Sequence, residues 1–261
     1  TKAPIVPPIV LGLAKHPAVE KYDLSSLELI LSGAAPLGEG IAMEAAARVG
    51  CSIAQGYGMT EASPVTHLLP IRSKAKKIGS IGLPIPNTEV MIVDPETEKP
   101  LYNNQNGEIW IRGPQIMKGY LNRPETTAES ITKEGWYRTG DIGYVDDEGF
   151  FYVVDRIKEL IKYKGMQVAP AELEALLLTH PAVSDAAVIP IADEEAGELP
   201  KAVVVIKTGL SVSAEEIMSF VAQRVAPHKK VRIVEFVEQI PKSASGKILR
   251  RVLIQKEREK N

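Results

Sequence analysis

A strand–helix–strand pattern near the start of the sequence constrains the fold more than any other feature. Two short apolar stretches, residues 27–31 and 51–55, flank an alanine-rich stretch, residues 38–49, that reads as a helix. This order predicts a parallel β-α-β unit. In such sheets ligands bind just beyond the carboxyl ends of the strands. Residues 32–34 and 56–58 follow those ends and are the first candidates for a binding site.

The sequence pattern changes twice after this unit. Between residues 78 and 154 short extended segments alternate with turns, which predicts a small antiparallel sheet or barrel. From about residue 158 onwards the pattern is that of a compact α+β module of about 100 residues. The elements expected there are helices at 171–179, 213–225 and 248–260 and strands at 186–191, 202–206 and 232–237, with a Ser213–Glu216 capping box opening the second helix.

The composition of the chain argues against several classes of function. The formal net charge of −2 over 261 residues gives no reason to expect a nucleic-acid partner. A single cysteine excludes a disulfide within the chain and favours the cytoplasm. No apolar run is long enough to span a bilayer. The apolar, proline-rich residues 5–10 are unusual for a free terminus and indicate the middle of a longer protein.

Two motifs in the first part of the chain could hold a nucleotide. In residues 55–61 glycines let the backbone approach a ligand, a tyrosine can stack on a base, Thr60 can bond a phosphate oxygen and Glu61 can hold magnesium. In residues 136–141 an aspartate after a tight Thr-Gly turn could accept two vicinal ribose hydroxyls. Each pattern alone also fits a plain turn with no ligand.

Two lysine-containing motifs lie further along the chain. Residues 155–165 place cations beside apolar positions at the expected domain boundary. Residues 241–251 place Lys247 after a Ser/Gly-rich loop at the expected start of the last helix, where it could contact a phosphate or a developing oxyanion. The Walker spacing is absent. A solvated linker and an exposed helix start are the structural alternatives.

Taken together and in this order, the motifs resemble those of the adenylate-forming superfamily, which includes acyl-CoA synthetases, 4-coumarate–CoA ligases and beetle luciferases. The resemblance covers essentially the whole chain and is strongest to the ligase and luciferase branch at residues 32–37, 107–113 and 162–174. It implies an α/β fold. Residues 1–157 would be the C-terminal part of a large AMP-binding domain with a small antiparallel β-barrel-like subdomain, and residues 158–261 a smaller mobile α+β domain.

The resemblance also implies an activity. Such enzymes join a carboxylic acid to AMP with release of pyrophosphate, and a thiol, usually that of CoA, then displaces AMP. The implied partners are therefore a carboxylic acid, ATP and CoA, with Mg²⁺ as cofactor. The residues expected to bind the nucleotide and line the acyl pocket are Ser32, Gly33, Ala34, Gly56, Tyr57, Gly58, Thr60, Asp141 and Arg156.

Individual roles follow from the same resemblance. Tyr57 would stack on adenine, Thr60 would contact the α-phosphate, and Glu61 would serve magnesium. Asp141 and Arg156 would hold the ribose.

The remaining roles fall in the smaller domain. Lys247 would bridge the carboxylate and the α-phosphate during adenylation. Lys162 and Gln167 would serve thioester formation. Lys158 would be the hinge about which the small domain rotates, so that each lysine reaches the cleft in turn.

One family feature is missing from the sequence. The family carries a Ser/Thr/Gly-rich loop followed by a lysine, which grips the β- and γ-phosphates, upstream of everything seen here. The resemblance therefore indicates a ligase present without its upstream half, or else a non-catalytic fragment that binds AMP. A luciferase-like adenylating oxygenase remains a third alternative. We expect the chain to need the upstream half, because residues 5–13 and a bare sheet edge would leave apolar surface uncovered.

Some conspicuous residues have a sufficient structural explanation. Trp110 alternates with apolar neighbours in a strand, so packing accounts for it. Cys51 is expected to begin a buried strand and to be inert. The four histidines His16, His67, His180 and His228 are scattered, and no pair has metal-ligand spacing.

Overall fold

The computed structural model describes residues 1–70, 77–243 and 246–260. The chain divides into two compact units, Thr1–Ile157 and Lys158–Asn261. The first unit contains a five-stranded sheet in the order β1-β2-β3-β4-β5. Its strands are β1 (Lys2–Ile5), β2 (Leu29–Ser32), β3 (Ser52–Gly58), β4 (Val65–Leu68) and β5 (Leu83–Pro84).

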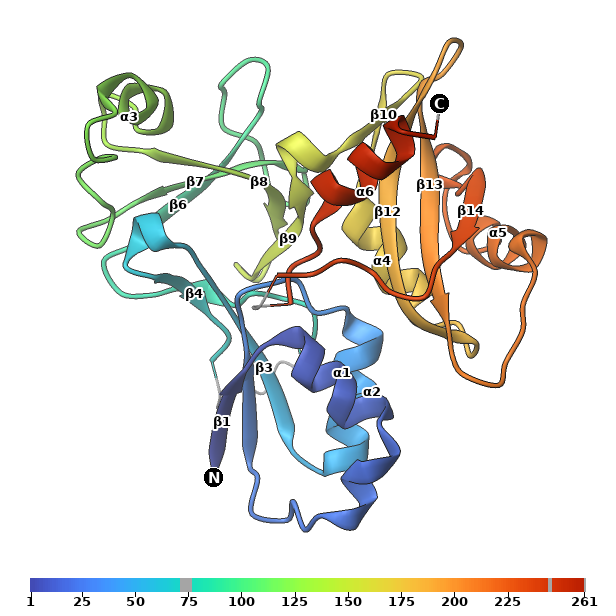
Figure 1. Ribbon diagram of the computed structural model, residues 1–261. Coiled ribbons are helices and arrows are strands. Elements are labelled where there is room, and N and C mark those ends of the chain that lie inside the picture. The colour runs from blue at the N-terminus through green and yellow to red at the C-terminus, as the bar shows by residue number, and fades with distance from the viewer. Residues whose placement is uncertain (71–76, 244–245, 261) are drawn as a thin grey trace. The chain divides into compact units, whose positions relative to one another are not determined.

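The predicted parallel β-α-β unit is confirmed. Strand β2 pairs with β3 in parallel, and α2 (Glu39–Val49) connects them. Gly50 ends this helix in the left-handed conformation at φ 74°. The structure adds a third parallel strand, because β1 pairs with β2 and leads into α1 (Pro7–Lys15). The two helices lie side by side next to the sheet (Figure 1).

The α1 helix accounts for much of the proline-rich start of the sequence. Pro7 stands in its first turn, where a missing backbone N–H is harmless. Val10 is fully buried, whereas Ile9 is half exposed. Apolar side chains in this stretch are therefore partly covered by the first unit itself.

The second sheet of this unit is antiparallel, as expected. Its strands are β6 (Glu89–Val93), β7 (Gly107–Arg112), β8 (Tyr137–Val145) and β9 (Phe151–Arg156), paired in chain order. The barrel-like form is wrong, because β6 and β9 are not paired with each other in the described residues and the sheet stays open. Between β7 and β8 lies the short helix α3 (Pro124–Ser130).

The C-terminal unit has a mixed sheet in the order β11-β10-β13-β12, with β14 paired to β13 in parallel. The strands are β10 (Ile161–Tyr163), β11 (Met166–Val168), β12 (Val183–Asp193), β13 (Gly197–Ile206) and β14 (Ile233–Phe236). The helices are α4 (Pro170–Leu177), α5 (Ala214–Ala222) and α6 (Arg250–Arg258). Four one-turn or two-turn 3₁₀ segments complete the described elements: η1 (Pro17–Lys21), η2 (Thr60–Ala62), η3 (Ile157–Glu159) and η4 (Pro227–Lys229).

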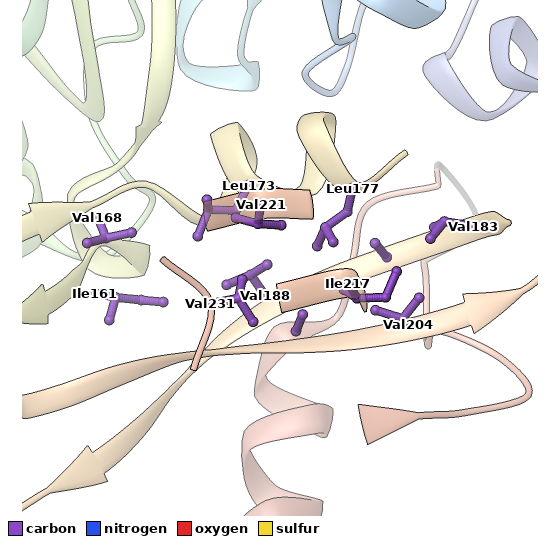
Figure 2. Packing of buried hydrophobic residues seen from close by; sticks show 12 residues of the cluster. Ile161, Val168, Leu173, Leu177, Val183, Val188, Val204, Ile217, Val221 and Val231 are labelled. Carbon is purple, nitrogen blue, oxygen red and sulfur yellow. The ribbon is translucent and has the colours of Figure 1, made fainter. Parts of the chain in front are cut away.

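Two apolar layers form on opposite faces of this sheet, since successive strand residues point in opposite directions. Helices α4 and α5 place Leu173, Leu177 and Ile217 against Val188 and Val204, all fully buried (Figure 2). The neighbouring strand residues Ala187, Ile189 and Val203 instead contact Ile240 and Leu253, the latter from α6. Burial on both faces fixes the register of β12 and β13.

The last helix begins later than the sequence indicates, at Arg250 and not at residue 248. The amides before it are used in a loop: Leu249 N–H donates to the carbonyl of Pro241, and Gly246 N–H donates to that of Ser243. Lys247 therefore precedes the helix and does not open it. Residues 244 and 245, in the middle of that motif, lie outside the described residues.

Substituting Ser213→Ala should destabilise the second unit by about 1 kcal/mol. The predicted capping box is present, with Ser213 Oγ accepting from Glu216 N–H at 3.1 Å and Glu216 returning a bond to Ser213 N–H at 2.8 Å. Hydrogen exchange of the α5 amides would measure the loss. Ser219→Ala, on the exposed face of the same helix, should have little effect. Equal effects of the two substitutions would contradict the capping role.

Candidate functional site

The carboxyl ends of β2 and β3 lie next to each other, as the parallel unit requires. A Cβ built on Gly33 would stand 3.7 Å from the carbonyl oxygen of Gly56. Ser32 ends β2 and is almost fully buried, and Ala34 adopts a left-handed φ of 72°, which costs energy for a residue with a side chain. Predicted site residues from two separate motifs therefore lie together at one edge of the sheet.

Gly58 has a structural explanation that sequence reasoning did not give. A Cβ at this position would lie 2.0 Å from the carbonyl oxygen of Pro64. Only glycine allows the end of β3 to pack against this turn. Gly56 is less restricted, since a Cβ there would meet the His67 carbonyl at 3.4 Å.

Three predicted residues form a hydrogen-bonded group around one carboxylate. The Tyr57 hydroxyl donates to Oδ2 of Asp141 at 2.5 Å, and Arg156 Nε donates to Oδ1 at 3.1 Å. Asp141 and Arg156 are direct partners in the β8–β9 ladder. Burial, followed by the charge of Asp141, raises the pKa of Tyr57 well above its usual value. The phenol therefore stays protonated at neutral pH and remains a donor.

Glu61 lies on the η2 turn that follows β3, beside the exposed Thr60. The Tyr120 hydroxyl donates to Glu61 Oε1 at 2.8 Å, and Met117 N–H donates to its backbone carbonyl at 2.8 Å. Among the described residues the structure gives Oε2 no donor. One ordered carboxylate with a free oxygen fits the way Mg²⁺ is held by one or two carboxylates, water and substrate phosphates.

Strands β2, β3 and β4 carry several buried polar side chains. This feature was not expected from the sequence. Ser32 Oγ, Gln55 Nε2 and His67 Nε2 are buried without a hydrogen-bond partner among the described residues. The His67 ring lies 5.7 Å from that of Tyr57 and 4.8 Å from that of Phe151. The sequence does show polar residues within these strand patterns, but it does not show that their side chains are buried.

The buried His67 should make the first unit less stable in acid. Burial lowers its pKa to about 3, whereas in the unfolded chain it is about 6.5. As the pH falls through this window, the unfolded state binds a proton that the folded state does not, so His67 contributes a slope of up to about 1.4 kcal/mol per pH unit. His67→Leu should remove that slope.

Urea unfolding followed by tryptophan fluorescence would measure this slope, since Trp110 and Trp136 both lie in the first unit. The exposed His16, replaced as His16→Leu, is the matched control and should keep the slope of the unsubstituted chain. If His67→Leu also kept it, the folded imidazole would have to be charged.

The second unit presents Lys162 and Gln167 side by side. They are direct partners across the β10–β11 hairpin, and both are exposed. The central turn residues Lys164 and Gly165 have φ values of 48° and 77°, which is the two-residue type I′ geometry. The turn holds these two predicted residues together on a short, exposed hairpin.

Lys247 and Lys158 are also exposed in this unit. Ser243 N–H donates to the carbonyl of Lys247 at 2.9 Å, and Lys247 N–H donates to Ser243 Oγ at 3.1 Å, so the lysine stands on a loop closed by its own backbone. Lys158 is the first residue of the second unit and lies within η3.

A buried ion network near these lysines was not expected from the sequence. Arg250, which begins α6, forms ion pairs with Glu159 of η3 and with Glu174 of α4, the second at 2.6 Å. Glu174 is 7% exposed and also accepts the Val188 N–H at 2.8 Å. The network joins the segment after Lys158 to the helix after Lys247.

Comparisons with known proteins agree with this architecture. The AMP-binding enzyme family model matches residues 1–121, and the model for the AMP-binding enzyme C-terminal domain matches residues 172–247. The chain belongs to this family of adenylate-forming enzymes.

Its relatives include 4-coumarate–CoA ligase 1 of Petroselinum crispum, 55% identical over 97% of this chain and 47% of the relative, and 4-coumarate–CoA ligase of Vanilla planifolia, 54% identical over 97% and 46%. The chain spans about half the length of the curated relatives it matches.

Solved structures with the same fold include ATP-bound MatB from Rhodopseudomonas palustris, with a TM-score of 0.91 and 30% identity over 98% of this chain and 50% of that one. The anthranilate CoA ligase AuaEII in complex with anthranoyl-AMP has a TM-score of 0.89 and 28% identity over 98% and 49%. The α/β fold expected from the resemblance is confirmed.

Two other features are absent from the described ranges. No helix there is long and apolar enough to cross a membrane. Nor do three or more His, Cys, Asp or Glu side chains gather there as a metal cluster.

Proposed function

We propose that the chain is the C-terminal part of an ATP-dependent acid–CoA ligase of the 4-coumarate–CoA ligase type. The observation that carries this proposal is the group of Tyr57, Asp141 and Arg156, hydrogen-bonded at the carboxyl end of β3. It suits a nucleoside, because an aromatic ring lies beside a carboxylate that can accept ribose hydroxyls. The names of the relatives supply the acid and the thiol.

In the first half-reaction a carboxylate oxygen of the acid attacks the α-phosphorus of ATP, and pyrophosphate leaves. Two anions must approach each other in this step, so positive charge has to be supplied. We assign Lys247 to the carboxylate and α-phosphate, and Thr60 to an α-phosphate oxygen. Ser32, Gly33 and Ala34 line the neighbouring adenine and acyl pocket.

In the second half-reaction the sulfur of CoA attacks the acyl carbon, and AMP leaves with the oxygen of the broken acyl–oxygen bond. We assign Lys162 and Gln167 to this step. Both they and Lys247 stand on the unit Lys158–Asn261. A rotation about Lys158 would bring the two groups to the reacting atoms in turn.

Glu61 would hold Mg²⁺ through Oε2, and Tyr120 would keep the carboxylate oriented. The ion would supply charge neutralisation for the phosphates.

Two further expectations complete the proposal. The chain needs the upstream half of the ligase for full activity, because the family's phosphate-gripping loop is absent from the sequence. The protein works in the cytoplasm, where its single cysteine stays reduced. Burial raises the pKa of that Cys51 thiol, which keeps it protonated and unreactive.

ATP–pyrophosphate exchange with a panel of hydroxycinnamic, aryl and fatty acids tests the proposal. It should be run on the chain alone and on the chain joined to the upstream half of the Petroselinum crispum ligase. We expect exchange in the joined protein, and its loss with Asp141→Ala. Asp23→Ala, which removes an exposed carboxylate of the same unit, should leave the rate unchanged.

Two results would contradict the proposal, each in a different part. Exchange by the chain alone would show that the upstream loop is dispensable. Absence of exchange from the joined protein with every acid, while the parent ligase is active, would favour a non-catalytic AMP-binding fragment.

A further inference from the structure

The strand that carries Asp141 departs from regular pairing just where Asp141 stands. In the β7–β8 ladder Trp110 pairs with Arg138 and Glu108 pairs with Ile142. The single residue Ile109 therefore faces three residues, 139–141, on β8. Bulges of this kind re-aim side chains next to binding sites.

Side chains replace the ladder bonds that the bulge removes. The Thr139 hydroxyl donates to the carbonyl of Ile109 at 2.7 Å and accepts the Asp141 N–H at 3.0 Å. Gly140, at a left-handed φ of 69°, donates its N–H to Oε1 of Glu108 at 2.8 Å. Each backbone group left by the bulge would otherwise lack a partner, at a cost in free energy.

Glu108 is itself held rigidly. It is 7% exposed, and its second oxygen, Oε2, accepts the indole N–H of Trp110 at 2.8 Å. Trp110 is buried too, with the Arg138 guanidinium 4.7 Å from its ring centre. Packing is therefore an incomplete account of Trp110, because its N–H also donates a hydrogen bond to a buried carboxyl oxygen.

We propose that Glu108 is a positioning residue for nucleotide selection. It acts through the Gly140 amide and fixes the bulge that aims Asp141 at the ribose hydroxyls. This inference rests on the proposed function, in which Asp141 binds the ribose. A site built to pair with a hydroxyl rejects an analogue that lacks it, because the analogue does not make that hydrogen bond. Glu108 should thus set how strongly ATP is preferred over 3′-deoxy-ATP.

The test uses Glu108→Gln in the joined ligase, with ATP–pyrophosphate exchange measured for both nucleotides. A glutamine offers one carbonyl oxygen where Glu108 offers two, so the Gly140 and Trp110 N–H groups cannot both be satisfied. We expect KM for ATP to rise about 10-fold, and the preference for ATP over 3′-deoxy-ATP in kcat/KM to fall by about 10-fold or more. Glu89→Gln, at the exposed first residue of β6 in the same sheet, should leave both quantities unchanged.

Trp110→Phe provides a second variant if Glu108→Gln does not fold. It removes the indole N–H together with part of the buried ring, and should lower the preference by a smaller factor. An unchanged preference in every folded variant overturns the inference while leaving the ligase activity in place. A joined ligase that catalyses exchange but never discriminates against 3′-deoxy-ATP would instead disprove the ribose role of Asp141, and the inference with it.

Discussion

Lys247→Ala is expected to slow adenylate formation in the joined ligase by about 10²–10³-fold, the usual cost of losing one charged group at a reacting oxyanion. The side chain is exposed on a loop closed by Ser243 and has no structural partner among the described residues whose loss would unfold the unit. ATP–pyrophosphate exchange measures this half-reaction directly. The substituted protein should melt at the temperature of its parent.

Lys162→Ala should have the opposite effect on the two half-reactions. Exchange should persist, whereas transfer of a preformed acyl-adenylate to CoA should slow. Lys256→Ala, an exposed lysine of α6, is the matched control for both assays and should change neither rate. If Lys247→Ala slowed both half-reactions equally, a division of labour between the two lysines would be wrong.

Arg250→Met is expected to destabilise the second unit by about 3–5 kcal/mol, because it removes a cation that forms an ion pair with the buried Glu174. The thioether chain fills similar space, so the cost is electrostatic. Glu174 also accepts the Val188 N–H, and its displacement should expose that strand to exchange. Hydrogen exchange at the Val188 amide reports on this unit selectively.

Two further variants test the electrostatic cause of this effect. Arg251→Met changes the next, exposed arginine and should cost under 1 kcal/mol. The double substitution of Arg250→Met with Glu174→Gln should recover part of the loss, since it also removes the charge of the buried carboxylate. No difference between the two arginine variants would mean that solvent reaches Glu174 when Arg250 is lost.

The sequence predicted those elements whose residues carry strong local signals. The antiparallel strands expected between residues 78 and 154 are present, and the Ser213 capping box was confirmed. Strand β1 was missed because its four residues include Pro4 and read as an irregular start. The β10–β11 hairpin was missed because Lys162 and Lys164 look like a solvated linker, although Ile161 and Val168 are fully buried.

In the candidate site, too, sequence motifs identify single residues, whereas contacts between distant residues appear only in the folded chain. The resemblance named Tyr57 and Asp141, but their hydrogen bond joins residues 84 positions apart, which no local pattern contains. Glu108 and Arg250 escaped notice because charged residues are usually exposed, and only the folded chain shows their burial. The expected roles of these residues in catalysis stay predictions.

The tight turn at Lys164 and Gly165 has a consequence for tolerance to insertion. Exposed loop tips usually accept extra residues. Here one added residue would shift the period-two alternation of β11 and exchange the exposed Gln167 with the buried Val168. Insertion scanning should therefore find that this exposed turn tolerates an added residue as poorly as the core does. Point substitutions at the exposed strand residues Lys162 and Gln167 keep the spacing and should preserve the fold.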